Sequence, residues 1–127
     1  MKKIVVDTSI LIEYIRLGEG RWNDLVEMSK NGDVRLLLPT VVMLELWSGK
    51  SMEKNKTEME TVKFLSIFSK LNLDEDTAKL AGKLRRENQI DGFDAVIAAS
   101  CLQEGAWLAT LNKKHFEKVE GLKLWVK

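Results

Sequence analysis

The stretch Ile4-Val5-Val6-Asp7-Thr8-Ser9-Ile10-Leu11-Ile12 decides the fold of this chain. Its first three residues are apolar and β-branched, and so short a run, ended by an acid, favours a buried strand over a helix. From Thr8 to Leu17 the apolar residues recur at helical spacing, so a helix is expected directly after the strand. Asp7 stands at the junction, where an aspartate can cap the helix, accept a phosphoryl group or bind a metal.

The change from strand to helix recurs along the rest of the chain. Further strands are expected over three ranges: 34–38, 106–109 and 122–126. Helical spacing is expected at 40–47, 62–71 and 91–104, and less cleanly at 25–28 before Asn31-Gly32. One more helix should begin at the cap Asp74 and turn four apolar residues inward: Ala78, Leu80, Ala81 and Leu84. Thr40 is the expected N-cap of the 40–47 helix, and the polar segment 50–61 is a loop or an exposed helix start.

This alternation predicts the fold class. We expect an α/β fold in three layers, with a central, mostly parallel sheet and helices on both faces, forming a single domain over residues 1–127. Such folds place their sites beyond the C-terminal ends of the strands. Here those ends are Asp7, the pair Pro39-Thr40, and the run Thr110-Leu111-Asn112.

Charge and composition exclude several classes of protein. The 127 residues carry 20 Lys and Arg against 19 Asp and Glu, a net charge of +1, so bulk positive charge does not drive binding to nucleic acid. No apolar stretch reaches the roughly 18 residues of a membrane span, and no signal peptide is recognisable. The only cysteine, Cys101, lies in an apolar run and is expected to be a buried core residue. A reducing cytoplasm is the expected location.

Three further acids lie in apolar segments. Glu45 is the only charged residue between Arg35 and Lys50, on a helix that leaves it a narrow exposed stripe. Asp91 and Asp94 are spaced i, i+3, so both carboxylates share one helix face. A solvent-facing Glu45 and a capping pair at 91 and 94 are the simpler interpretations. Mg²⁺ or Mn²⁺ would explain all of the acids together, because both ions prefer carboxylate oxygens and water.

Read in order, these segments resemble the PIN-domain family and, within it, the VapC-like toxins of bacterial and archaeal toxin–antitoxin pairs. The resemblance spans nearly the whole chain and rests on four segments: 4–12, 39–46, 92–99 and 108–116. It implies a compact α/β fold and Mg²⁺- or Mn²⁺-dependent cleavage of RNA by a metal-activated water. It also implies a homodimer and a small antitoxin of the VapB type that covers the acidic cleft.

The resemblance assigns roles to individual residues. The acids that match the family's metal ligands are Asp7, Asp94 and Glu45, and Asp91 is a further candidate one turn from Asp94. Thr8 or Ser9 would support the first carboxylate by hydrogen bonding. Thr110 and Asn112 belong to the C-terminal matching segment, where Asn112 would orient a carboxylate or a water.

The chain departs from the family pattern at one position. Members commonly carry a fourth acid near the place of His115, and imidazole suits Mn²⁺ better than Mg²⁺. His115 therefore supports the site or is a plain surface histidine. Basic residues lie beside the acids and would hold RNA phosphates, or else form solvated faces: Lys83, Arg85, Arg86, Lys113 and Lys114.

Three functional hypotheses follow from these observations. The first is a metal-dependent endoribonuclease, the toxin of a type II toxin–antitoxin pair, with Asp7, Glu45 and Asp94 as catalytic residues. The second is a catalytically weak PIN-like module that binds RNA or a protein, suggested by the missing fourth acid. The third is a receiver-type domain phosphorylated on Asp7. Such a domain needs a lysine directly after a late strand, and this chain has none directly after the strand at 106–109.

Overall fold

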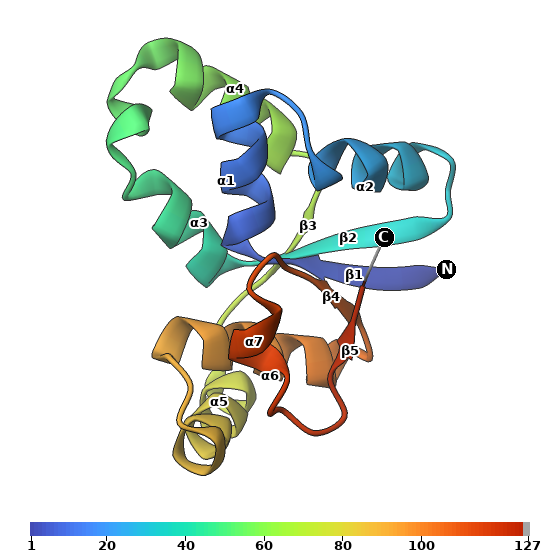
Figure 1. The fold of residues 1–127 in the computed structure, drawn as a ribbon, viewed down its shortest axis with the longest axis vertical. Helices are drawn as coiled ribbons and strands as arrows, with labels where there is room; N and C mark the ends of the chain where they lie inside the picture. Colours follow the sequence, from blue (N-terminus) through green and yellow to red (C-terminus); the bar gives the residue numbers. More distant parts are fainter. Residues whose placement is uncertain (126–127) are drawn as a thin grey trace.

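A five-stranded parallel sheet forms the centre of the computed structural model, which describes residues 1–125 (Figure 1). The strands lie in the order β3-β2-β1-β4-β5, so β1 is the middle strand. Their bounds are β1 Lys2–Val6, β2 Val34–Pro39, β3 Ser69–Leu71, β4 Trp107–Ala109 and β5 Lys123–Leu124. All four neighbouring pairs are parallel, which confirms the predicted sheet type.

Helices cover both faces of this sheet. Figure 1 shows α1 to α4 on one side and α5 to α7 on the other, so the three-layer α/β architecture is confirmed. The first group comprises α1 Thr8–Leu17, α2 Arg21–Lys30, α3 Thr40–Trp47, the 3₁₀ turn η1 Lys50–Glu53 and α4 Asn55–Leu65. The second comprises α5 Glu75–Asn88, α6 Gly92–Glu104 and α7 Lys113–Phe116. None of the helices over residues 1–125 combines the length and apolar character that a membrane crossing needs.

The strand β1 fixes the position of Asp7. Ile4 pairs with Leu36 of β2 on one side and with Trp107 of β4 on the other. A strand covered on both faces reads as a continuous apolar run, and the last three residues of β1 are fully buried. The Asp7 N–H then donates to the Ala109 carbonyl at 3.0 Å, which extends the pairing by one residue. This bond brings Asp7 beside Thr110, the first residue after β4.

Several local predictions are confirmed. Asp7, Asp74 and Asp91 are the N-caps of α1, α5 and α6, and each carboxylate accepts a hydrogen bond from a backbone N–H of its helix. Gly105 ends α6 in the left-handed conformation (φ 62°), which suits a glycine. Cys101 is completely buried in the core, where burial and the nearby Asp7 charge raise the pKa of its thiol far above the ordinary value.

The segment 62–71 was predicted wrongly as one helical stretch. The helix α4 starts at Asn55 and ends at Leu65, and residues 69–71 form the edge strand β3. The polar segment 50–61 accordingly holds η1 and the first part of α4. Edge strands are short and pair on one side only, so β3 needs no long apolar run.

Smaller corrections concern helix boundaries and faces. Pro39 rather than Thr40 occupies the N-cap of α3, and Thr40 is its first helical residue. Ala78 was predicted to point inward but is exposed, and its neighbour Thr77 is the buried residue of α5 at this point. The last strand is confined to Lys123–Leu124, and the predicted Val126 lies outside the described residues.

Candidate active site

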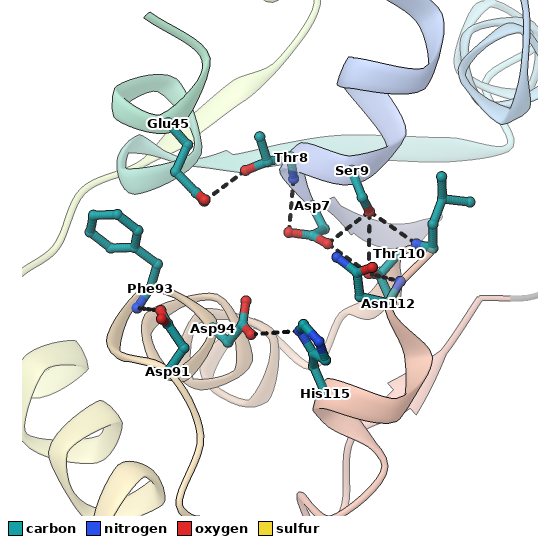
Figure 2. Close-up of polar contacts among 11 residues, drawn as sticks. Asp7, Thr8, Ser9, Glu45, Asp91, Phe93, Asp94, Thr110, Asn112 and His115 are labelled. Atoms are coloured by element: carbon teal, nitrogen blue, oxygen red, sulfur yellow. Dashed lines mark hydrogen bonds and ion pairs between the residues drawn. The ribbon is translucent and has the colours of Figure 1, made fainter. Parts of the chain in front are cut away.

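The four carboxylates that the sequence singled out line one cavity at the C-terminal edge of the sheet. The cavity, whose wall also includes Glu13, has a volume of about 690 Å³, and these four acids are Asp7, Glu45, Asp91 and Asp94. They come from three places in the fold: the end of β1, the helix α3 that follows β2, and the first turn of α6. Figure 2 shows them around a common space. The parallel topology has therefore brought together the acids that the sequence singled out.

Asp7 is the most rigidly held of these acids. Asp7 is only 3% exposed to solvent. Oδ1 accepts from the Thr8 N–H at 2.8 Å, and Oδ2 accepts from the hydroxyls of Ser9 at 2.9 Å and Thr110 at 2.6 Å. Oδ2 thus accepts two hydrogen bonds, whereas Oδ1 accepts only one and keeps capacity for a further partner, and Asp7 lines the cavity. These donors orient Asp7 without exhausting its capacity to bind a cation.

Ser9 and Thr110 belong to a network that also fixes the loop after β4. The Ser9 hydroxyl accepts from the Leu111 N–H at 3.0 Å, and the Thr110 hydroxyl accepts from the Asn112 N–H at 3.0 Å. The Asn112 side chain lines the cavity, but its contribution to this network is the backbone N–H. The predicted supporting residues thus surround Asp7, as Figure 2 shows.

Glu45 is linked to the same end of β1 through Thr8. The Thr8 hydroxyl donates to Glu45 Oε1 at 2.8 Å, while the Thr8 N–H bonds Asp7. Burial raises the pKa of Glu45 above its ordinary value; the Thr8 bond opposes this shift, and the charges of Asp7, Asp94 and Asp91 add to it. Glu45 therefore does not sit on a solvent stripe but faces the other acids.

Asp94 is paired with the histidine that replaces the expected fourth acid. His115 Nδ1 lies 3.1 Å from Asp94 Oδ2, within hydrogen-bond distance. Burial raises the pKa of Asp94, and the charge of Asp7 adds to the shift, whereas His115 lowers it. The His115 side chain is itself more than half exposed. His115 is therefore part of the cavity wall and not an isolated surface residue.

Asp91 combines the two roles considered for it. Its carboxylate accepts from the Phe93 N–H at 2.8 Å and so caps α6. It also lines the cavity, and its charge contributes to the raised pKa of both Glu45 and Asp94. The capping interpretation therefore explains the geometry of Asp91. Because Asp91 is also exposed, its carboxylate remains available to a cation.

The donor set fits a hydrated divalent cation. Among residues 1–125, no three His, Cys, Asp or Glu side chains are close enough to enclose a metal ion. Mg²⁺, however, keeps several waters and needs only one or two direct carboxylates. Burial first, and the charges of neighbouring acids second, raise the pKa values of Glu45 and Asp94, and a bound cation would offset both effects. The cavity therefore fits a hard cation with oxygen ligands better than a closed zinc site.

The predicted basic residues are distributed unevenly. Lys113 and Lys114 are exposed on α7, next to His115. Lys114 lines a small cavity that also contains Asp91 and Asp94. Arg85 and Arg86 are exposed on α5 and are not among the residues that line the acid cavity.

Several other residues of the cavity were not anticipated, and three of them bear on its chemistry. Glu13 and Arg16 project from α1, and Phe93 from the first turn of α6. Glu13 forms an ion pair with Arg21 at 2.9 Å, which leaves Arg16 as the cation of that wall. Helical spacing could have found Arg16, because it follows Ser9 by two turns and must share its face.

A comparison with known protein families shows which family the chain belongs to. The model of the PIN domain family matches residues 4–122, and the chain therefore belongs to the PIN domain family. Two curated relatives bear the name ribonuclease VapC. Ribonuclease VapC1 of Methanocaldococcus jannaschii is 29% identical over 98% of this chain and 88% of its own length. Ribonuclease VapC2 of Rickettsia felis is 30% identical over 93% of this chain and 92% of its own length.

Solved structures agree with this assignment. The VapBC2 complex of Rickettsia felis, bound to a promoter DNA fragment, contains a chain that matches with a TM-score of 0.83 and 25% identity, over 97% of both chains. A DNA-bound VapBC of Salmonella typhimurium matches with a TM-score of 0.82 at 20% identity, over 98% of both chains. The fold and the resemblance to VapC proteins are thus confirmed, and a receiver-type domain is not supported.

Proposed function

We propose that the chain is a metal-dependent endoribonuclease, the VapC-like toxin of a type II toxin–antitoxin pair, formed by a single PIN domain over residues 1–127. The observation that carries the proposal is the acid cavity, where a buried, hydrogen-bonded Asp7 faces Glu45 and Asp94. The ribonuclease relatives supply the reaction class. The reaction is hydrolysis of an RNA phosphodiester.

Asp7, Glu45 and Asp94 are the proposed metal-binding and catalytic residues, with Asp91 as an additional ligand. The cation is Mg²⁺ or Mn²⁺, as the oxygen donors require. When bound, such a cation lowers the pKa of a water molecule and stabilises the charge that develops on the phosphate. The protein contributes the geometry: Ser9 and Thr110 hold Asp7, and Thr8 holds Glu45 at a fixed distance from it.

His115 favours Mn²⁺ over Mg²⁺ in this proposal. Its Nδ1 lies 3.1 Å from Asp94 Oδ2, and it places an imidazole at the cavity wall where the resemblance expects a carboxylate. Mn²⁺ accepts imidazole more readily than Mg²⁺ does. We therefore expect the chain to work best with Mn²⁺.

A VapB-type antitoxin and a homodimer are proposed as the assembly in the cell, and the cytoplasm as its location. The solved structures that the chain resembles are VapBC complexes, which supports a protein partner of that type. The buried, unpaired Cys101 is compatible with a reducing compartment. A segment of such a partner would cover the acid cavity and exclude RNA.

A second candidate function is a catalytically weak module that binds RNA or a protein. One observation favours it: His115, beside Asp94, stands where the resemblance expects a fourth acid. Absence of measurable Mn²⁺ binding by calorimetry would select this function over the nuclease.

Cleavage of a single-stranded RNA with Mg²⁺, Mn²⁺ or EDTA tests the proposal. We expect Mn²⁺-dependent cleavage by the wild type and a loss of about 100-fold or more in Asp7→Asn, as for the removal of one charge-stabilising group. Asp74→Asn is the matched control, because it also changes a helix-capping aspartate but lies away from the cavity. Cleavage in EDTA, or equal losses in both variants, would contradict the assignment.

A further inference from the structure

The acid cavity is the middle part of a longer groove. A cavity of about 470 Å³ shares Ile12, Arg16 and Glu45 with it. On the opposite side, a cavity of about 250 Å³ shares Asp91, Asp94 and His115. The three cavities therefore adjoin one another through these shared wall residues, and together they are here called the three-part groove. It runs from η1, past the ends of the strands, to α7.

Positive charges stand at both ends of the three-part groove. Lys50 and Lys54 line the end near η1, and Arg16 stands between that end and the acids. Lys114 and Lys118 line the other end. None of these five cations is held by an ion pair to a described residue. The groove is thus positive at its ends and negative in the middle, so a chain of phosphates would be held on both sides of the cation site.

An exposed aromatic ring lies inside the middle part. Phe93 is 39% exposed, although a phenylalanine gains stability by burial. Its N–H bonds Asp91, and Figure 2 shows its ring on the side of α6 that faces Glu45. Leu17 and Leu111 are also exposed at the same cavity. Nucleobases stack on such rings irrespective of their sequence, provided that they are unpaired.

We propose that single-stranded RNA lies along the three-part groove. Its backbone phosphates contact Lys50 and Lys54 at one end and Lys114 and Lys118 at the other, and a base next to the scissile phosphate stacks on Phe93. A single strand fits better than a duplex, because only an unstacked base can meet the ring. Each nucleotide brings both a phosphate and a π-face, which an acidic peptide does not. This inference rests on the proposed function and specifies the path of its substrate.

The charge contribution is tested by the salt dependence of RNA binding. Fluorescence anisotropy with a labelled, mixed-sequence oligoribonucleotide in EDTA measures affinity without cleavage. For the double variant Lys50→Ala/Lys54→Ala, the slope of log K against log salt should fall by about 1.4, at about 0.7 per phosphate contact. Lys79→Ala/Lys83→Ala is the matched control, because these exposed lysines have the same spacing on α5 but lie outside the groove. Equal slopes in both double variants would overturn the path.

The stacking contribution is tested at Phe93. Phe93→Ala should weaken binding by roughly 5- to 150-fold, whereas Phe93→Trp should retain wild-type affinity. Phe93→Leu keeps an apolar side chain without a π-face, so it should resemble alanine. In cleavage assays the loss should fall on KM and leave kcat at saturating RNA largely unchanged. Leucine as effective as phenylalanine would refute stacking, as would an unchanged KM.

These tests are separable from the proposed nuclease activity. RNA binding that depends on the lysines and on Phe93, without any Mn²⁺-dependent cleavage, would support the groove and reject the nuclease. Cleavage by the wild type that is insensitive to all groove variants would support the nuclease and reject the groove. Calorimetric Mn²⁺ binding should be the same in wild type and groove variants, and its loss in Phe93→Ala would overturn the assignment of Phe93 to the RNA.

Discussion

Replacing Thr110 by valine removes one hydroxyl from the Asp7 network and leaves the shape of a buried side chain almost unchanged. The Thr110 hydroxyl donates to Asp7 Oδ2 at 2.6 Å and accepts from the Asn112 N–H at 3.0 Å. A hydrogen bond to a charged group contributes about 1.5–3 kcal/mol. The Asn112 N–H can then donate a hydrogen bond to water instead, because Asn112 is exposed. We therefore expect Thr110→Val to lower the free energy of unfolding by about 2 kcal/mol.

The assay is urea unfolding, supported by thermal melts and Mn²⁺ calorimetry. A loss of about 2 kcal/mol corresponds to a fall in Tm of roughly 6–10 °C for a domain of this size. Mn²⁺ affinity should fall by about 10-fold or more, because Asp7 loses a group that orients it.

Thr77→Val is the matched control for this prediction. The Thr77 hydroxyl also donates to a capping aspartate, Asp74, at 2.8 Å, and the residue is similarly buried. It lies away from the acid cavity, so its replacement should cost stability but leave Mn²⁺ affinity unchanged. The reasoning is refuted if Thr110→Val unfolds like the wild type, or if both variants lose Mn²⁺ affinity equally.

Three further predictions concern the charges of the cavity. Burial raises the folded-state pKa of Glu45, so the folded protein loses stability as the pH rises from the unfolded value of 4.5 through that raised pKa. Glu45→Gln, which can still accept from Thr8, should therefore melt higher than the wild type at pH 8 in EDTA. This advantage should shrink toward pH 4. If Glu45→Gln melts at a lower temperature than the wild type at pH 8, the predicted direction of the effect is wrong. His115→Asp should raise Mg²⁺ affinity relative to Mn²⁺ in calorimetric titrations, because a carboxylate replaces imidazole; an unchanged ratio would exclude His115 from the ion's surroundings. Mn²⁺ at ten times its Kd should stabilise the wild type by about 1.4 kcal/mol, or roughly 5 °C, and Asp94→Asn should abolish the shift in melting temperature.

The middle of the sheet could be predicted from the sequence because its strands are covered on both faces. Ile4–Val6 and Leu36–Leu38 are continuous apolar runs, as fully buried parallel strands must be. The edge strand β3 could not, because Ser69 and Lys70 carry no such signal and its pairing with β2 exists only in the folded chain. Its one-sided pairing makes it dependent on tertiary context.

The acids of the site could be predicted for a similar physical reason. Glu45 and Asp94 are charges in apolar segments, which is unfavourable unless other groups compensate them. Their convergence with Asp7 follows from the parallel order of β2, β1 and β4. Phe93 escaped notice, because a phenylalanine beside a cap is ordinary in sequence, and only the fold shows that it lines the cavity. Arg16 could have been found from its helical spacing to Ser9.

The most direct test of the central claim compares cleavage with metal occupancy. The rate of single-stranded RNA cleavage by the wild type is measured as Mn²⁺ is added, and the Mn²⁺ Kd is determined separately by calorimetry. We expect the rate to rise with the same Kd, to fall to background in EDTA, and to be lost together with Mn²⁺ binding in Asp94→Asn. Cleavage that persists without bound Mn²⁺, or Mn²⁺ binding that survives in Asp94→Asn, would contradict it.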